Sequence, residues 1–460
     1  MNKKLNVCLI NDSFPPAIDG VATAVVNYAT IIQEKLGQAT VVTLDYPEAD
    51  DSVFPFPVVR YPSLNTTKLV GYRTGVPLST GTIDKLESGD FHLIHTHCPI
   101  TSAILARILR DRIHVPLILT YHTKFDIDIA NAIRGKSLQK TAIQMLVDNI
   151  SACDEVWTVS RGAGENLRSL GYEGKYIVMP NGVDFPKGRV SDALIKQVSE
   201  GYDLPEGVPV FLFVGRMMWY KGIRITLDAL KQLAADGQDF RMVFIGGGTD
   251  KDEIIAYTKK LGLSGQVIFI PPIHDREAIR AWYCRADLFL FPSTFDTNGL
   301  VVRESAACGL GSVLIQGSCA AEDATDGQNS FLIEENADAM AAVLRRVCKD
   351  PEAMRRIGEN AESDLYISWE DAVTNAYDRY VYVQENYRAG IYPEHDTFSD
   401  FIFRALGGGM DRHIQALHKR DQNLQEMNAL RDRTFDLIEE AQSSIEKDLH
   451  DFGDYLDRFH

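Results

Sequence analysis

The stretch "ADLFLFPSTFDTNGLVVRESAACGLG", Ala286 to Gly311, contains a strand, a turn and a helix in the order that builds a parallel α/β sheet. The apolar run "LFLFPS" ends at a Pro-Ser turn, which predicts a buried strand, and the apolar periodicity from Leu300 onward predicts a helix. Asp296 follows the strand, and Glu304 lies in the first turns of the helix. Two acids around a helix start at a strand's carboxyl end indicate a polyhydroxylated, phosphate-bearing ligand rather than a solvated face.

The same alternation of strand and helix runs through the chain in two series. The first series contains "NVCLIND", "TVVTLD", "HLIHTH", "PLILTYHT" and "DEVWTVS", and the second "PVFLFVG", "FRMVFIGGG", "QVIFIPPI", "ADLFLFPS" and "GSVLIQG". Continuous apolar strands between helices are typical of parallel sheets covered on both faces. A polar segment near 184–207 separates the series, so we expect an α/β fold of two doubly wound, Rossmann-like domains facing a cleft. We place these domains at 1–185 and 186–367.

The chain after the second series is helical in pattern. A Ser N-cap opens the predicted helix Ser368–Tyr387, whose apolar face carries aromatic side chains, and we treat 368–388 as a unit separate from the tail 389–460. The tail has apolar residues on one heptad position, which Arg431 interrupts, and two more on the neighbouring seam: Leu417, Leu424, Ile438, Ile445 and Phe452, with Leu449 and Leu456. This pattern predicts an amphipathic helical tail, compatible with self-association, membrane docking or packing against the domains.

Charge limits the classes of partner. The chain carries a formal net charge of −17, and all of this excess lies in residues 191–460, because residues 1–190 have equal numbers of acids and bases. Nucleic-acid binding is therefore not expected. Basic residues do outnumber nearby acids in one part of the first domain: Arg107, Arg110, Arg112, Lys124, Arg134, Lys136 and Lys140. This region would suit an anionic membrane surface, although such helix faces are more often simply solvated.

The cysteines and the N-terminal sequence indicate the cellular compartment in which the protein works. Seven cysteines without a C-x-x-C pair stand mostly in apolar contexts, which favours buried free thiols over disulfides or zinc. The N-terminus has no apolar segment typical of a signal peptide, and no apolar run approaches the roughly 18 residues that span a bilayer. We therefore expect a cytoplasmic protein, at most peripheral on the inner face of the cell membrane.

Four residues outside the opening stretch are candidates for chemistry. Arg216 and Lys221, in "FVGRMMWYKG", follow the first strand of the second series, where two cations can hold a diphosphate and stabilise its charge as it leaves. Gly20 lies at the start of the first helix, where phosphate can approach backbone N–H groups. His122 follows a strand of the first domain and would orient an acceptor hydroxyl or contact a phosphate. Taken singly, each has a plain structural alternative; together with the two acids they indicate one site.

Metal binding is not expected. His95 and His97 in "IHTHC" have no acidic ligand at useful spacing, so a structural role is favoured. Asp126 and Asp128 form a D-x-D, but their position after His122 in the first domain disfavours a metal–nucleotide role. The turn "IGGGTD" lacks both G-x-G-x-x-G spacing and a P-loop lysine.

As an ordered set, these motifs resemble the retaining GT-B glycosyltransferases of family 4. The likeness spans roughly Leu5 to Tyr387 and rests on "FPPAIDGVATAV", "HTH", "TYHT", "PNGVD", "GRMMWYKG", "ADLFLFPS" and "GLVVRESAACG". The branch it looks most like glycosylates lipids: diacylglycerol glucosyltransferases and phosphatidylinositol mannosyltransferases. By this resemblance, Ser368–Tyr387 is the crossover helix that returns to the first domain.

The resemblance also implies roles for single residues. Glu304 matches the second Glu of the family's Glu-x7-Glu motif, which binds the ribose hydroxyls, and Asp296 stands where the first Glu contacts the transferred sugar. The helix N-terminus between them, Asn298, Gly299 and Leu300, faces the diphosphate.

The remaining candidates also match positions of the family. Arg216 and Lys221 match the phosphate loop, Gly20 the glycine loop near the diphosphate, and His122 the cleft histidine.

The implied reaction moves a hexose from a UDP- or GDP-sugar to an acceptor hydroxyl, such as that of diacylglycerol, with retention and without a cofactor. The departing diphosphate would help deprotonate the acceptor. Asp296 is one methylene shorter than the family's Glu, about 1.5 Å of reach, and such a misplacement can cost about 100-fold in rate when nothing compensates. Three alternatives stay open: a soluble acceptor, a GT-B enzyme of another class, and a non-catalytic scaffold acting through its tail.

Overall fold

The computed structural model describes residues 4–393 except for 18, 68–72, 126–128, 130–132 and 134. The predicted heptad tail and the D-x-D at 126–128 lie outside the described residues.

The first sheet contains seven parallel strands in the order β3-β2-β1-β6-β7-β8-β9. Its strands are β1 (Asn6–Asn11), β2 (Gln38–Leu44), β3 (Val58–Tyr61), β6 (Leu93–Thr96), β7 (Leu117–Tyr121), β8 (Glu155–Thr158) and β9 (Ile177–Val178). The helices between and beside them are α1 (Gly20–Ile31), its π-helical extension η1 (Ile32–Leu36), α3 (Thr80–Glu87), α4 (Thr101–Ile113), α6 (Lys136–Ser151) and α7 (Arg161–Ser169). We call this part the first lobe.

The second sheet has six parallel strands in the order β12-β11-β10-β13-β14-β15. Its strands are β10 (Val210–Val214), β11 (Arg241–Ile245), β12 (Val267–Ile270), β13 (Leu288–Phe291), β14 (Ser312–Ile315) and β15 (Phe331–Ile333). The accompanying helices are α8 (Asp192–Ser199), η2 (Trp219–Lys221), α9 (Ile223–Ala235), α10 (Lys251–Lys260), α11 (Arg276–Arg285), α12 (Leu300–Ala307), η3 (Cys319–Ala321), α13 (Ala337–Val347) and α14 (Pro351–Asp364). We call this part the second lobe.

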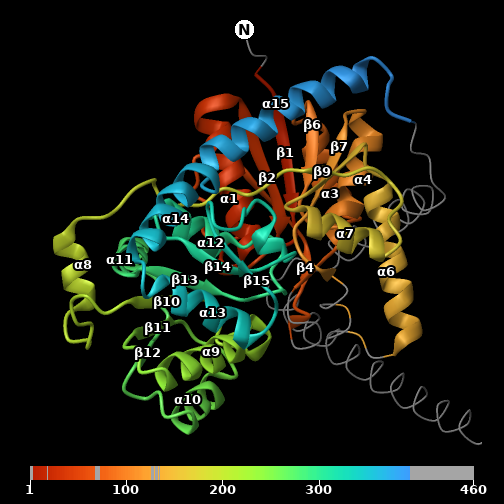
Figure 1. Ribbon diagram of the computed structural model, residues 1–460. Helices are drawn as coiled ribbons and strands as arrows, with labels where there is room; N and C mark the ends of the chain where they lie inside the picture. The colour runs from red at the N-terminus through yellow and green to blue at the C-terminus, as the bar shows by residue number, and fades with distance from the viewer. Residues whose placement is uncertain are drawn as a thin grey trace, which may run out of the picture. The chain divides into compact units, whose positions relative to one another are not determined.

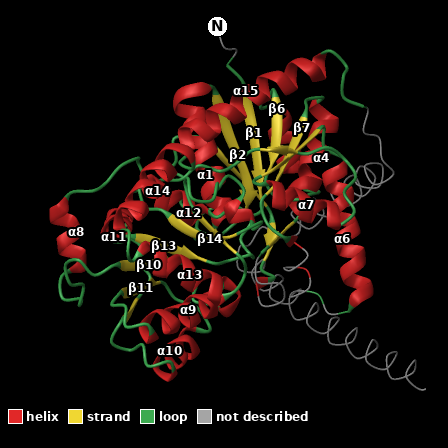
Figure 2. Cartoon of the chain, in the orientation of Figure 1, coloured by secondary structure: helices red, strands yellow, loops and turns green. Residues whose placement is uncertain are grey.

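Each lobe follows from its apolar strands. β6, β7, β13 and β14 are buried along their whole length, because helices cover both faces of each sheet (Figure 2). The strand order reverses between β1 and β6 in the first lobe and between β10 and β13 in the second. Ligands of doubly wound folds bind at such reversals, beyond the carboxyl ends of the strands.

The last described helix, α15 (Trp369–Arg388), returns to the first lobe (Figure 1). Ser368 caps it by accepting a hydrogen bond from the Asp371 N–H at 3.0 Å. Its buried stripe includes Val373, Tyr377 and Tyr380, which join the hydrophobic core around β1 and α1. The Tyr377 hydroxyl accepts a 2.6 Å bond from the Leu5 N–H, so the start and the end of the described chain are joined in one core.

The predicted class, two doubly wound parallel α/β lobes with a returning helix, is confirmed. Five strands were not predicted: the edge strands β3, β9 and β15, and a short antiparallel pair, β4 (Ser63–Leu64) with β5 (Thr74–Gly75). β4 and β5 are too short to show a periodic pattern, and pairing across the fold rather than local sequence places β3. Within the part of the chain that the structure describes, no helix is long and apolar enough to cross a membrane.

Candidate active site in the cavity between the lobes

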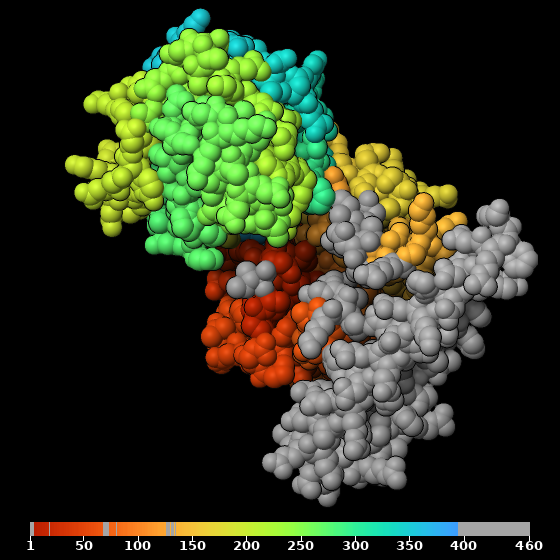
Figure 3. All heavy atoms as spheres, turned by 90° about the horizontal axis from the view of Figure 1, so that it is seen from below, coloured from red at the N-terminus to blue at the C-terminus, as the bar shows by residue number. Residues whose placement is uncertain are grey.

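A cavity of about 780 Å³ lies at the carboxyl ends of β1, β6 and β7 in the first lobe and beyond the carboxyl end of β13 in the second. From the first lobe it is lined by residues that follow β1, β6 and β7, among them Asp12, His97 and His122. From the second lobe it is lined by 296–301, the segment that joins β13 to α12. In the space-filling view, the surface is hollowed where the red N-terminal residues meet the green residues of the second lobe (Figure 3). His122, Gly20 and Asp296, which are far apart in the sequence, therefore line the same cavity.

His122 is buried, and its Nε2 lies 2.9 Å from Nδ1 of His97. Burial lowers the pKa of His122 to about 4, and it lowers the pKa of His97 well below the usual range. Both imidazoles are therefore neutral near pH 7. His95 lies deeper, bonded through Nδ1 to the Tyr380 hydroxyl at 2.5 Å and through Nε2 to Thr120 Oγ1 at 2.7 Å. Its partners give His95 the structural role that was expected, whereas His97 also reaches the cavity wall.

Gly20 begins α1, as predicted, but the backbone donors beside it are already occupied. The Asp19 carboxylate accepts bonds from the N–H groups of Val21 and Ala22, both at 2.8 Å, and from the Ser13 hydroxyl. Nothing lies within 4 Å of a Cβ placed on Gly20, so its neighbours do not require glycine there. Asp19 was not singled out in the sequence, although an Asp just before an apolar-periodic run is an N-cap signal.

Lys221 and Asp296 form an ion pair in the second lobe. Lys221 is buried, and its Nζ lies 2.6 Å from Asp296 Oδ1, while the Ser293 hydroxyl donates to Asp296 Oδ2 at 2.5 Å. Gly222 brings the two loops together: it has φ +74°, and a side chain there would overlap the carbonyl of Pro292. Asp296, which the resemblance assigns to the sugar, and Lys221, which it assigns to the diphosphate, are thus bonded directly to each other.

Arg216 stands in the same loop but is exposed, with its guanidinium carbon 6.0 Å from the centre of the Tyr220 ring. The Gly-Gly-Gly turn 246–248 packs beneath this loop, where the Met217 N–H donates to the Gly247 carbonyl at 2.8 Å. The turn therefore supports the loop through close backbone packing.

Glu304 lies on α12 and is paired separately from Asp296. Its carboxylate accepts bonds from Arg276 Nη2 at 2.9 Å and from the Tyr283 hydroxyl at 3.2 Å. Burial raises the pKa of Glu304, and Arg276 opposes this shift. Arg276 and Tyr283 were not singled out in the sequence, because their proximity depends on the packing of α11 against α12.

The start of α12 is shaped by Gly299, which has φ +57°, and a Cβ placed on it would lie only 2.9 Å from Ala320. Asn298 precedes it, and its buried Nδ2 has no hydrogen-bond partner among the residues that the structure describes. Leu300 is the first residue of α12. All three line the cavity, as expected for the helix start between the two acids.

Two of the seven basic residues considered for membrane contact are wrongly placed for it. Arg107 and Arg110 are 1% and 4% exposed. They bond to Asn149 Oδ1 at 2.7 Å and to the Ala152 carbonyl at 2.5 Å, because α4 packs against the C-terminal end of α6 and its capping residue. Lys136 and Lys140 on α6 remain exposed.

The described residues include no group of three or more His, Cys, Asp and Glu side chains that could hold a metal ion. All seven cysteines are free thiols.

Each lobe matches a known protein-family model. Residues 18–186 match the family model Glycosyltransferase Family 4, and residues 195–364 match the model Glycosyl transferases group 1. The two matches together cover most of the chain.

Two relatives illustrate the range of activities in the family. D-inositol 3-phosphate glycosyltransferase 2 of Catenulispora acidiphila is 28% identical over 326 residues, which is 67% of this chain and 74% of the relative. Alpha-monoglucosyldiacylglycerol synthase of Streptococcus pneumoniae is 22% identical over 309 residues, covering 66% and 70%.

Among solved structures, HepE of Anabaena in complex with UDP and glucose superposes with a TM-score of 0.62 at 17% identity, covering 82% of this chain and 99% of HepE. At that identity the likeness concerns the fold alone. The sequence motifs, the two matched domains and the two sheets agree, and the chain belongs to the family 4 glycosyltransferases with the GT-B fold.

Proposed function

We propose that this glycosyltransferase moves a hexose from a UDP- or GDP-sugar to an acceptor hydroxyl with retention of configuration. The observation that carries the proposal is the single cavity lined by both His122 and the segment 296–300. A donor bound to the second lobe and an acceptor bound to the first would meet there.

The donor's diphosphate would interact with Lys221 and Arg216. Lys221 is held by Asp296 at 2.6 Å, and a diphosphate would provide a second anion for the same ammonium. Arg216 is exposed and therefore able to approach the ligand. Cations placed where charge develops on a leaving group lower the barrier, because they stabilise the transition state more than the ground state. HepE, which has the same fold, was solved with UDP and glucose.

The sugar would lie near Asp296 and the ribose near Glu304. Since Ser293 and Lys221 both bind the Asp296 carboxylate, its position is fixed despite the shorter side chain. Retention in this proposal uses no enzymic nucleophile: the leaving diphosphate accepts the proton of the incoming hydroxyl. His122, with its pKa lowered to about 4, is neutral and orients the acceptor through hydrogen bonding rather than charge.

For the acceptor, we favour an uncharged hydroxyl such as that of diacylglycerol. Asp19 places a carboxylate at the start of α1, on the cavity wall, and like charges about 4 Å apart repel by about 1–4 kcal/mol near a protein surface. Arg73 also lines this wall, but its Nε donates to Ser63 at 2.9 Å and its guanidinium stacks on Tyr46. The relative from Streptococcus pneumoniae is named for a diacylglycerol glycolipid. Such an acceptor implies peripheral contact with a membrane, for which Lys136 and Lys140 are exposed.

The test is nucleotide-sugar turnover by the purified protein. UDP-glucose, UDP-galactose, UDP-N-acetylglucosamine and GDP-mannose are each offered with diacylglycerol vesicles, with inositol 3-phosphate, or with neither, and released UDP or GDP is followed. We expect release that needs the vesicles and that falls at least 100-fold in Glu304→Gln. Glu352→Gln, an exposed change on α14, is the matched control and should keep full activity.

Release that requires inositol 3-phosphate instead would keep the transferase and overturn the neutral acceptor. Failure of all four donors to bind or turn over would overturn the proposed reaction and favour a non-catalytic scaffold.

A further inference from the structure

The N-terminus of α7 in the first lobe is capped by a side chain from the second lobe. The Glu322 carboxylate accepts a bond from the Arg161 N–H at 2.6 Å and another from the Gly162 N–H. The Ala163 N–H, which also has no acceptor within the helix, donates to Ser160 Oγ at 3.0 Å. Glu322 directly follows η3, and its side chain is only 17% exposed. An anion at a helix N-terminus satisfies backbone donors and interacts favourably with the helix dipole.

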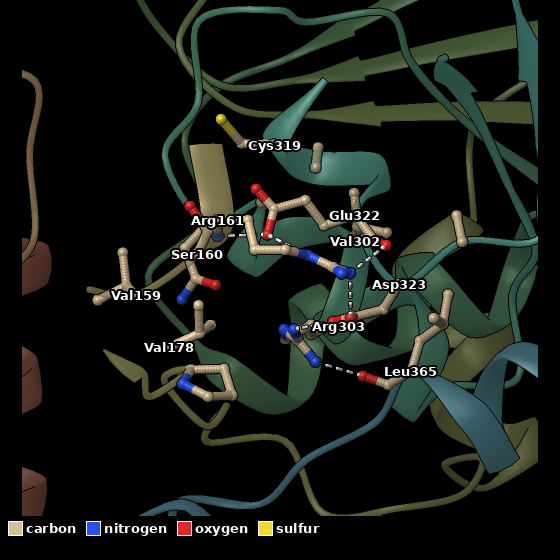
Figure 4. Close-up of a pocket in the computed structure, with 15 residues that line it drawn as sticks. Val159, Ser160, Arg161, Val178, Val302, Arg303, Cys319, Glu322, Asp323 and Leu365 are labelled. Atoms are coloured by element: carbon tan, nitrogen blue, oxygen red, sulfur yellow. Dashed lines mark hydrogen bonds and ion pairs between the residues drawn. The ribbon is translucent and has the colours of Figure 1, made fainter. Parts of the chain in front are cut away.

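The same turn of α7 holds the loop that enters the cavity. The Ser160 hydroxyl donates to the carbonyl of Thr297, which lies between Asp296 and Asn298. Asn298 and Gly299 line the 780 Å³ cavity and also a second pocket of about 270 Å³ beside Ser160, Arg161 and Glu322 (Figure 4). The loop 296–300 therefore lies between the cavity on one side and the α7 contact on the other.

Gly162 makes this approach sterically feasible. A Cβ at Gly162 would overlap the sulfur of Cys319 and lie 3.1 Å from Glu322 Oε1. Since glycine is less favourable than alanine inside a helix by about 1 kcal/mol, its presence here needs a packing reason. The closeness of η3 to α7 supplies that reason.

We propose that Glu322, Ser160 and Gly162 form an interlobe clasp that holds the loop 296–300 in its binding position. Glu322 is then a positioning residue: it contacts α7 rather than substrate, and α7 acts on the loop through Ser160. This inference rests on the proposed function only in that the loop binds the sugar nucleotide. Opening of the clasp lowers the fraction of molecules with the loop in place and raises the apparent KM for donor by the same factor.

The first test needs no activity. Amide hydrogen exchange is measured on the full chain for peptides covering 156–170 and 293–303, in the wild type and in Glu322→Gln. We expect exchange in both peptides to accelerate about fivefold, the effect of losing a charged cap. Asp350→Asn, which alters the cap of α14 within the second lobe, is the matched control and should change neither peptide. If exchange accelerates only in the peptide 156–170, Glu322 caps α7 but does not hold the loop 296–300, and the clasp is overturned.

The second test uses steric rescue. Gly162→Ala should accelerate exchange in 293–303 and raise the donor KM about fivefold with kcat within twofold, because the new methyl group separates α7 from η3. Cys319→Ala removes the sulfur that the methyl group meets, so the double variant Gly162→Ala/Cys319→Ala should return both quantities to within twofold of Cys319→Ala alone. Failure of this rescue would overturn the clasp.

The two failures can be told apart. If no donor turns over in the wild type, the proposed reaction fails, while hydrogen exchange still decides whether the clasp exists.

Discussion

At the scale of single residues, Arg216 and Lys221, the two cations after β10, differ in burial and in their partners. Lys221 is buried and paired with Asp296 at 2.6 Å, whereas Arg216 is exposed. Removing one partner of a buried ion pair leaves an uncompensated charge, while removing an exposed charge costs little.

Arg216→Gln and Lys221→Gln should therefore separate activity from stability. Both should lower donor turnover by about 100-fold or more, since each removes a charge from the departing diphosphate. Only Lys221→Gln should also lower Tm, by several degrees, because Asp296 loses its partner. Thermal unfolding and nucleotide release measured on the same preparations check this. Equal Tm values for the two variants would contradict the structural role of Lys221.

The Asp19 carboxylate should set acceptor charge preference. Asp19→Asn keeps an oxygen that can accept from the Val21 and Ala22 N–H groups but removes the negative charge. We expect kcat/KM for an anionic acceptor, inositol 3-phosphate, to rise about tenfold relative to that for diacylglycerol. Competition between the two acceptors measures the ratio, and Asp350→Asn is the control. An unchanged ratio would remove Asp19 from acceptor selection.

The buried histidines make stability depend on pH. The folded-state pKa of His122 is about 4, below its usual 6.5, so the unfolded chain binds the proton first as pH falls. The contribution of the uncharged His122 to the free energy of unfolding is fully present above about pH 6.5 and is lost progressively toward pH 4. By pH 5 this loss is about 2 kcal/mol. His95 and His97, whose pKa values burial also lowers, act in the same direction.

Urea unfolding at pH 8 and pH 5 measures this effect. The difference in unfolding free energy between the two pH values should shrink by about 2 kcal/mol in His122→Asn and stay unchanged in His274→Asn, a change at an exposed position. A wild type equally stable at both pH values would contradict the burial of uncharged histidines.

At the scale of elements, the turn from β13 into α12 depends on a glycine. Gly299 combines a φ of +57° with a 2.9 Å approach to Ala320, whereas Gly317 has φ +79° with nothing near its would-be Cβ. Gly299→Ala should therefore lower Tm more than Gly317→Ala, because both suffer backbone strain of about 1 kcal/mol but only the first adds a clash. Donor turnover should fall only in Gly299→Ala. Equal effects on Tm would mean that η3 shifts away from the new methyl group without loss of stability, which would contradict the clash with Ala320.

Elements were more predictable than the contacts between them. The strand "LFLFPS", the helix from Leu300 and the Ser368 cap all follow from local periodicity and capping chemistry, and the structure has each of them. The pairs Lys221–Asp296 and Glu304–Arg276, and the capping of α7 by Glu322, join residues far apart in the chain. Such pairs depend on how loops and lobes meet, which no local pattern encodes.

At the scale of the whole molecule, α15 ties the second lobe back to the first through the histidine cluster. The Tyr380 hydroxyl bonds to His95 Nδ1 at 2.5 Å, and its ring stacks on Trp157 at 5.3 Å. His95 in turn contacts His97, whose ring centre lies 4.0 Å away and which reaches the cavity. The returning helix therefore supports the wall of the candidate active site.

Tyr380→Phe tests this link with the smallest change the chain offers. It keeps the ring stacked on Trp157 and removes only the hydroxyl, so His95 Nδ1 loses its partner at a buried position, at a cost of about 1–3 kcal/mol. Tm should fall by roughly 2–6 °C. Tyr382→Phe on the same helix, where the side chain is 48% exposed, is the matched control and should leave Tm unchanged. If the two variants have the same Tm, the hydroxyl of Tyr380 does not stabilise the histidine cluster. The coupling of α15 to the cavity wall then rests on apolar packing alone.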